Sequence, residues 1–143
     1  MTKVLLLVHV EETFRKFFSD DLLNNIEKAI NNGEFDEVIH FTSGINNEEP
    51  VEEITTLVDE EIDWGWGYEP EVFENQPHEL EHVIESIGHE YTWIPPELRE
   101  RASRLKNCHV TLGGGYHAEC LADMVAVLNH LDIPFDYRRE FVY

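Results

Sequence analysis

The sequence predicts a three-layer α/β/α sandwich built around a mostly parallel sheet of about five strands. Residues 3–10 form an almost continuous apolar run, which is typical of a central strand buried on both faces. A helical apolar stripe and a second strand over 35–42 follow, so the first third of the chain forms a β–α–β unit. Strands and helices alternate again from 95 to the end, and 143 residues suit one domain, 1–143.

The remaining elements follow from local signals. Ser19 and two aspartates favour a helix start near Asp20, and Gly33 ends that helix. Apolar residues at helical spacing predict an acidic helix over 48–62. The other expected elements are a loop over 63–70, a strand over 80–87, a helix over 95–105, a strand over 108–112, a glycine turn over 113–115, a helix over 117–131 and an edge strand over 134–143.

The charge is strongly negative and unevenly distributed. The net charge is −20, and residues 29–98 hold 19 Asp or Glu and no Lys or Arg. Such a surface repels a phosphate backbone, so the sequence predicts no nucleic-acid partner. Three explanations remain open for the acidic segment: a solvated face, a docking surface for a basic partner, or mimicry of nucleic acid.

Other sequence features bear on the location and the partners of the protein. No apolar run is long enough to cross a bilayer, so we expect no membrane partner. Two cysteines, Cys108 and Cys120, fit a reduced protein better than a disulfide scaffold, which favours a cytoplasmic location. The short terminal strands leave apolar surface to cover, so we expect a homo-oligomer.

Two strand ends carry residues with useful chemistry. Ligands of open parallel sheets bind beyond the carboxyl ends of the strands, where the strand order reverses. The first strand ends at His9, and the strand before the last helix ends in glycines followed by Cys120. A glycine turn that opens a helix exposes backbone N–H groups, and the helix dipole favours a thiolate there. We therefore expect a small-molecule site with the binding residues Gly114, Gly115, Tyr116 and Glu119.

Three segments resemble the isochorismatase-like cysteine hydrolases. They are residues 5–14 (LLLVHVEETF), 91–98 (YTWIPPEL) and 110–121 (VTLGGGYHAECL). In that family the first strand ends in a catalytic Asp with a Phe five residues later, and the nucleophilic Cys lies six residues after a strand-ending glycine. His9 with Phe14, and Gly114 with Cys120, match this spacing. The resemblance covers residues 3–14 and roughly 88–143, about half of the chain. The resemblance implies a Rossmann-like fold and hydrolysis of a small carbonyl, amide or vinyl-ether substrate through Cys120.

The chain departs from that family at two catalytic positions. His9 stands where the family has Asp, and no Lys lies between Lys28 and Lys106, where the family has its catalytic Lys. Cys120 would then need another base, and His9 and His117 are the candidates. The alternative is a catalytically degenerate member that serves in binding or assembly through an acidic docking surface. In that case Cys120 and His9 are core residues and His117 has no chemical role.

No cofactor is expected, with one alternative. If His9, His117 and Cys120 converge, with Glu11, Glu12 or Glu119 nearby, imidazole and thiolate groups would suit zinc. His78 and His82 would form a metal pair only if they lay on a helix.

Overall fold

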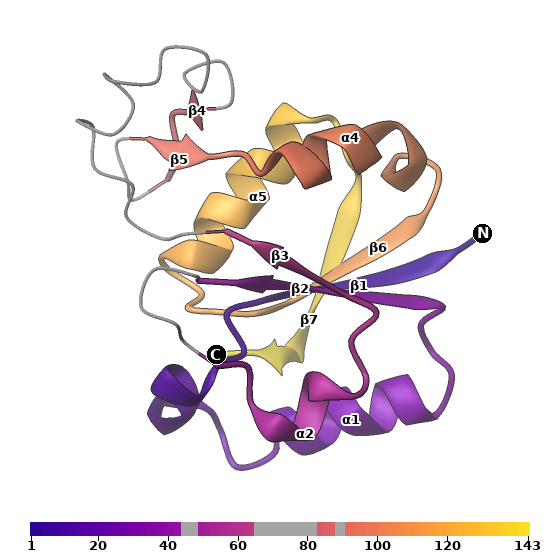
Figure 1. The fold of residues 1–143 in the computed structure, drawn as a ribbon, viewed down its shortest axis with the longest axis vertical. Helices are drawn as coiled ribbons and strands as arrows, with labels where there is room; N and C mark the ends of the chain where they lie inside the picture. The colour runs from indigo at the N-terminus through magenta and orange to yellow at the C-terminus, as the bar shows by residue number, and fades with distance from the viewer. Residues whose placement is uncertain (44–48, 65–82, 88–90) are drawn as a thin grey trace.

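The structure is a computed structural model, and it describes residues 1–43, 49–64, 83–87 and 91–143. Its centre is a five-stranded parallel sheet in the order β3-β2-β1-β6-β7. This arrangement confirms the predicted α/β, Rossmann-like sandwich (Figure 1). The sheet strands are β1 (Lys3–Val8), β2 (Glu37–Thr42), β3 (Glu60–Asp63), β6 (His109–Gly114) and β7 (Phe135–Val142).

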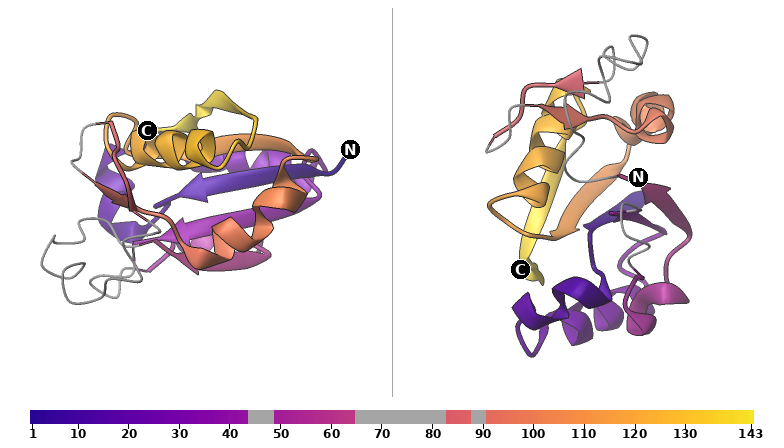
Figure 2. Two further views of the ribbon diagram at one scale, coloured as in Figure 1. Left: turned by 90° about the horizontal axis from the view of Figure 1, so that it is seen from above. Right: turned by 60° about the vertical axis from the view of Figure 1, so that its left-hand side comes forward.

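Helices cover both faces of the sheet. One face carries α1 (Leu22–Asn31) and the short α2 (Glu52–Thr55), and the other carries α4 (Pro96–Leu105) and α5 (Cys120–His130), as Figures 1 and 2 show. A 3-10 helix, η1 (Glu12–Phe17), follows β1. Each face has its own apolar core, and β1 contributes to both because its side chains alternate between the faces. Burial on both faces explains why β1 is an unbroken apolar run.

The acidic helix expected over 48–62 is wrong in most of its length. Within the described residues 49–62, only Glu52–Thr55 is helical, and Glu60–Asp63 forms the edge strand β3, parallel to β2. Asp59 favours this pairing, because its carboxylate accepts a hydrogen bond from the Val38 N–H at 2.7 Å and its own N–H donates to the Val38 carbonyl. The apolar residues of this segment fit helical spacing, but Ile62 is buried as a strand residue.

Other boundaries also differ. Within the expected strand over 80–87, the described part contains only β4 (Val83–Ile84), which pairs antiparallel with β5 (Thr92–Trp93) in a separate two-stranded sheet. Gly113 and Gly114 belong to β6 rather than to a turn, and α5 begins at Cys120. The predicted edge strand is confirmed as β7. Residues 65–70 of the predicted loop lie outside the described residues.

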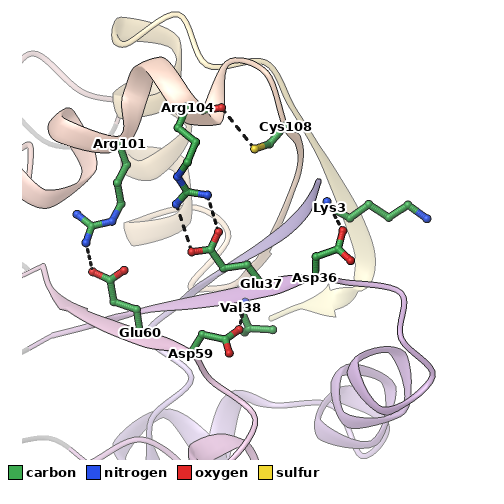
Figure 3. Close-up of polar contacts among 9 residues, drawn as sticks. All are labelled: Lys3, Asp36, Glu37, Val38, Asp59, Glu60, Arg101, Arg104 and Cys108. Carbon is green, nitrogen blue, oxygen red and sulfur yellow. Dashed lines mark hydrogen bonds and ion pairs between the residues drawn. The ribbon is translucent and has the colours of Figure 1, made fainter. Parts of the chain in front are cut away.

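Arginines of α4 bind acidic residues of the sheet. Arg104 contacts Glu37 of β2 at 2.7 Å, and Arg101 contacts Glu60 of β3 (Figure 3). Parts of the acidic segment are therefore neutralised within the fold. Across the described ranges, no helix is both long and apolar enough to span a membrane.

Candidate functional site

The two strand ends singled out in the sequence meet at one edge of the sheet. β1 and β6 are parallel neighbours, with Val8 opposite Gly114. The chain moves outward from β1 to β2 and β3, and then returns to the other side of β1 with β6 and β7. The strand order therefore reverses between β1 and β6, which is where such folds bind ligands. His9 and Cys120 both follow this edge, as predicted.

The glycines at this edge allow close backbone packing. Gly114 has a φ of +95°, and a Cβ atom there would overlap the Val8 carbonyl oxygen. The Gly115 N–H donates to that same oxygen at 2.9 Å, and the Tyr143 N–H donates to the Gly114 carbonyl at 3.0 Å. The Gly115 N–H is thus already bonded to β1 and is not an open anion-binding donor.

His9 is held in one orientation and one tautomer. The residue is 1% exposed with a φ of +50°, and its ring stacks on Phe14 at 6.0 Å and tilts against Trp64 at 5.6 Å. Its Nε2 lies 3.2 Å from the Trp64 carbonyl oxygen. A carbonyl only accepts hydrogen bonds, so Nε2 carries the proton and Nδ1 is an unprotonated acceptor. Within the described part of the chain, no group hydrogen-bonds to this Nδ1.

A second buried histidine, His40 on β2, lies next to this site. Its Nε2 accepts a hydrogen bond from the Val10 N–H at 2.9 Å, so its proton is on Nδ1, 4.0 Å from a carboxylate oxygen of Glu61. Burial lowers the pKa of His9 to about 4, although the bond to Trp64 opposes this. Burial and the neighbouring His9 lower the pKa of His40 to about 3. Both imidazoles are therefore neutral at pH 7.

A buried carboxylate and a tyrosine complete the polar groups. Glu11 is fully buried and accepts hydrogen bonds from the backbone N–H and the hydroxyl of Ser43, both at 3.0 Å. The Tyr143 hydroxyl donates to the His9 carbonyl oxygen at 2.5 Å, and burial raises the pKa of Tyr143. We call the group the carboxyl-edge cluster; it consists of His9, Glu11, His40, Ser43, Trp64 and Tyr143.

Cys120 sits in an environment that opposes ionisation. The residue is 5% exposed and belongs to the apolar core beneath α4 and α5. Burial raises the pKa of its thiol well above the ordinary value, and the charges of Asp123 and Glu119 raise it further. The start of α5 does not compensate for these effects, so the thiol stays protonated at neutral pH.

The residues between the glycines and Cys120 lie at the surface. His117 is exposed, and its N–H donates to the Tyr143 carbonyl at 2.8 Å. Its side chain lines a mostly apolar hollow of about 320 Å³ beside α5 and β7. Tyr116 is also exposed and packs against Phe17. Glu119 precedes α5 and is exposed.

The zinc alternative lacks a ligand set here. Among the residues that the structure describes, no three His, Cys, Asp or Glu side chains are grouped so as to hold a metal ion. His9, His117 and Cys120 therefore do not form the expected trio. His78 and His82 lie outside the described residues.

Sequence reasoning identified His9 but missed most of its surroundings. His40 is the one basic residue in the strand EVIHFT, and Glu11 directly follows the first apolar run, so both interrupt apolar sequence. A polar residue within or next to an apolar strand was therefore the sequence feature that could have identified His40 and Glu11. Trp64 acts through its backbone carbonyl, for which a sequence carries no signal.

The fold and this edge define a Rossmann-like α/β domain with a buried polar cluster at its topological switch point. Comparisons of the chain with models of known protein families, with curated proteins and with solved structures find no match.

Proposed function

We propose that this chain is an isochorismatase-like binding domain that does not use Cys120 for hydrolysis. The observation that carries the proposal is the state of that thiol, which is buried in an apolar core and has a raised pKa. The thiolate, not the thiol, is the nucleophile in cysteine enzymes. A buried, protonated thiol serves as a small apolar core residue.

The switch point is the proposed binding site for a small molecule. Buried polar groups are costly to maintain, and a fold retains them where they have a role. The carboxyl-edge cluster places two imidazoles, a carboxylate and a tyrosine at the edge where parallel sheets bind ligands. The unneutralised part of the acidic segment is the proposed docking surface for a basic partner.

The second candidate function is cysteine-dependent hydrolysis of a small carbonyl, amide or vinyl-ether compound. One observation favours it: β1 and β6 are neighbours, so His9 and Cys120 follow the same edge, and His9 Nδ1 carries a free lone pair. In this mechanism His9 would take the thiol proton as a general base. Thiol reactivity separates the two functions.

We expect Cys120 and Cys108 of the folded protein to react with iodoacetamide equally slowly at neutral pH. Both residues are at most 8% exposed, and the pKa of Cys120 is raised. The measurement is the alkylation rate at each cysteine by mass spectrometry of digested protein, with the urea-unfolded chain as the reference for full reactivity.

Cys108→Ser and Cys120→Ser variants assign each rate to one thiol. Alkylation of Cys120 at least tenfold faster than that of Cys108 in the folded protein would support the hydrolase and overturn the binding proposal. His9→Gln should then slow that fast reaction, because the base would be gone.

We also expect the chain to form a homodimer or a larger assembly. Tyr137 on the edge strand β7 and Ile87 are each 65% exposed and border the apolar hollow beside α5. Exposed apolar surface of this kind is commonly covered by association. Light scattering at tens of micromolar protein tests this, and a monomeric mass would contradict it.

A further inference from the structure

We infer that two copies of this chain associate through β7, whose strands pair antiparallel about a two-fold axis at Tyr137. In this arrangement the central sheets of the two copies join into one continuous sheet. The inference rests on the homodimer expected above. It adds the surface that is covered, the register of the two strands and the residues that hold the copies together.

The side of β7 that faces away from β6 is open in the part of the chain that the structure describes. β7 is the last strand of the sheet, and β6 is its one strand neighbour there (Figure 2). An edge strand of this kind presents backbone N–H and C=O groups that can pair with a strand of another chain. Its pairing with β6 is regular over 135–137 and shifts in register after Tyr137, so the regular part of the edge is short.

The charge of the chain determines which edge of the sheet can approach its own copy. Two chains of net charge −20 repel each other over most of their surface. The other edge strand, β3, has the sequence EEID, so any two-fold pairing of β3 with itself places carboxylates opposite carboxylates. β7 has two acidic and two basic residues, which are Asp136, Arg138, Arg139 and Glu140. Opposite charges can therefore be matched at β7 and not at β3.

The side chains near Tyr137 alternate between the two faces of the sheet. Asp136 contacts Nε2 of His109 at 3.2 Å, and Arg138 lines the same small hollow as His109. Arg138 also packs on the ring of Phe141, which belongs to the core on the α1 face. Tyr137 borders the apolar hollow beside α5, on the opposite face. Residues directly opposite each other in an antiparallel pair point to the same face, so the two-fold axis must pass through a residue of β7.

One position of that axis matches opposite charges without placing like charges together. An axis through any charged residue of β7 puts that residue opposite its own copy. An axis through Tyr137 puts Asp136 of each copy opposite the partner's Arg138, which gives two ion pairs. Arg138 already bonds Glu34 and Glu140 through Nη1 and Nε, and its five N–H donors leave capacity for another carboxylate.

Apolar surface beside the axis adds to the contact. Tyr137 is 65% exposed and borders the mostly apolar hollow of about 320 Å³, whose lining includes Leu121 and Val125 of α5. The two-fold axis keeps α5 of both copies on the same face of the joined sheet. The two tyrosines therefore meet at the axis, between the two hollows. An aromatic cross-strand pair and the covering of exposed apolar surface both stabilise such an interface.

The first test reverses the charges of the ion pairs, and analytical ultracentrifugation measures the dissociation constant of the dimer. Asp136→Arg and Arg138→Asp each place like charges opposite each other, so each should weaken dimerisation about tenfold or more. The double variant Asp136→Arg/Arg138→Asp exchanges the two charges and should restore wild-type dimerisation. Asp20→Arg is the control: it lies at an exposed site and changes the net charge as Asp136→Arg does. Because it lowers the general repulsion, it should leave dimerisation unchanged or slightly stronger.

The second test measures the register with an engineered disulfide. Opposite residues of an antiparallel pair have Cα atoms about 4.5–5.5 Å apart, within the range that a disulfide spans. Tyr137→Cys should therefore give a covalent dimer on mild oxidation. Arg139→Cys is the control, because its two copies would lie four residues apart along the strands, about 13 Å, and should not cross-link. Mass spectrometry of the digested dimer identifies the linked residues and distinguishes them from the native cysteines.

The outcomes separate the surface from the oligomeric state. A monomeric wild type would overturn this inference together with the expected homodimer. A dimer that survives both charge reversals, or that does not cross-link through Tyr137→Cys, overturns the surface and leaves the homodimer standing. Circular dichroism shows whether each variant is folded, and the cross-linking result decides the question if a charge-reversal variant does not fold. Neither test depends on the reactivity of Cys120.

Discussion

At pH 5 the free energy of unfolding should be about 4 kcal/mol lower than at pH 7, roughly 2 kcal/mol from each of His9 and His40. Their pKa values fall from 6.5 in the unfolded chain to about 4 and about 3 in the fold. Between pH 6.5 and 4 the unfolded chain therefore binds two protons that the folded protein does not. Stability from these groups is fully present above pH 6.5 and is lost as the pH falls. Urea unfolding at half-unit pH steps measures this slope.

Substitutions of single histidines provide the controls. His40→Gln keeps an acceptor for the Val10 N–H but does not titrate, so the loss between pH 7 and pH 5 should fall by about half. His130→Gln, at the exposed end of α5, should leave the loss unchanged. The range from pH 5 to pH 7 lies above the pKa values of ordinary carboxyl groups. The loss of stability caused by the histidines can therefore be distinguished from a loss caused by carboxyl groups. Equal slopes in wild type and His40→Gln would contradict the prediction.

Gly114→Ala should cost more than about 4 kcal/mol of stability, enough to unfold many small domains. The added Cβ would overlap backbone atoms of Val8, and these cannot move aside because β1 is hydrogen-bonded to strands on both sides. The positive φ of Gly114 adds conformational strain. Circular dichroism and urea unfolding measure the loss.

Gly33→Ala is the matched control. Gly33 also has a positive φ, +75°, but a Cβ atom there meets nothing within 4 Å. Gly33→Ala should lower the free energy of unfolding by about 1–2 kcal/mol, the cost of placing a residue with a Cβ atom in a left-handed conformation. If Gly114→Ala is no more harmful than Gly33→Ala, close packing of β1 against β6 is not what requires the glycine.

The central sheet could be predicted because strands that are buried on both faces consist almost entirely of apolar residues. β1 is flanked on both sides and covered on both faces, so nearly every residue is apolar and the strand cannot be mistaken. The edge strand β3 has one buried residue in four, with the pattern EEID, and resembles the end of an acidic helix. Its pairing depends on the hydrogen bonds of Asp59 and on the edge of β2 that faces away from β1. Neither produces a repeating apolar pattern in the sequence.

Only those features of the site that depend on the spacing of residues along the chain could be predicted. The distance from Gly114 to Cys120 located the edge of the sheet, and the topology confirms that His9 shares it. The electrostatics were not predictable, because the thiol pKa depends on how deeply Cys120 is buried. The pairing of Glu11 with Ser43 joins residues 32 positions apart, and that of Tyr143 with His9 joins residues 134 apart. Such contacts exist only after the sheet has formed.

The place of β1 in the sheet also constrains how the chain is made. During synthesis β1 emerges first and can pair with β2, but its other partner is β6, which joins Lys3 to His109. Until β6 leaves the ribosome, one long apolar edge of β1 lacks its neighbour, and pairings this distant in sequence form slowly. Aggregation is therefore most favoured during the interval of synthesis in which β1 has formed but β6 has not, and a chaperone would bind the chain during that interval.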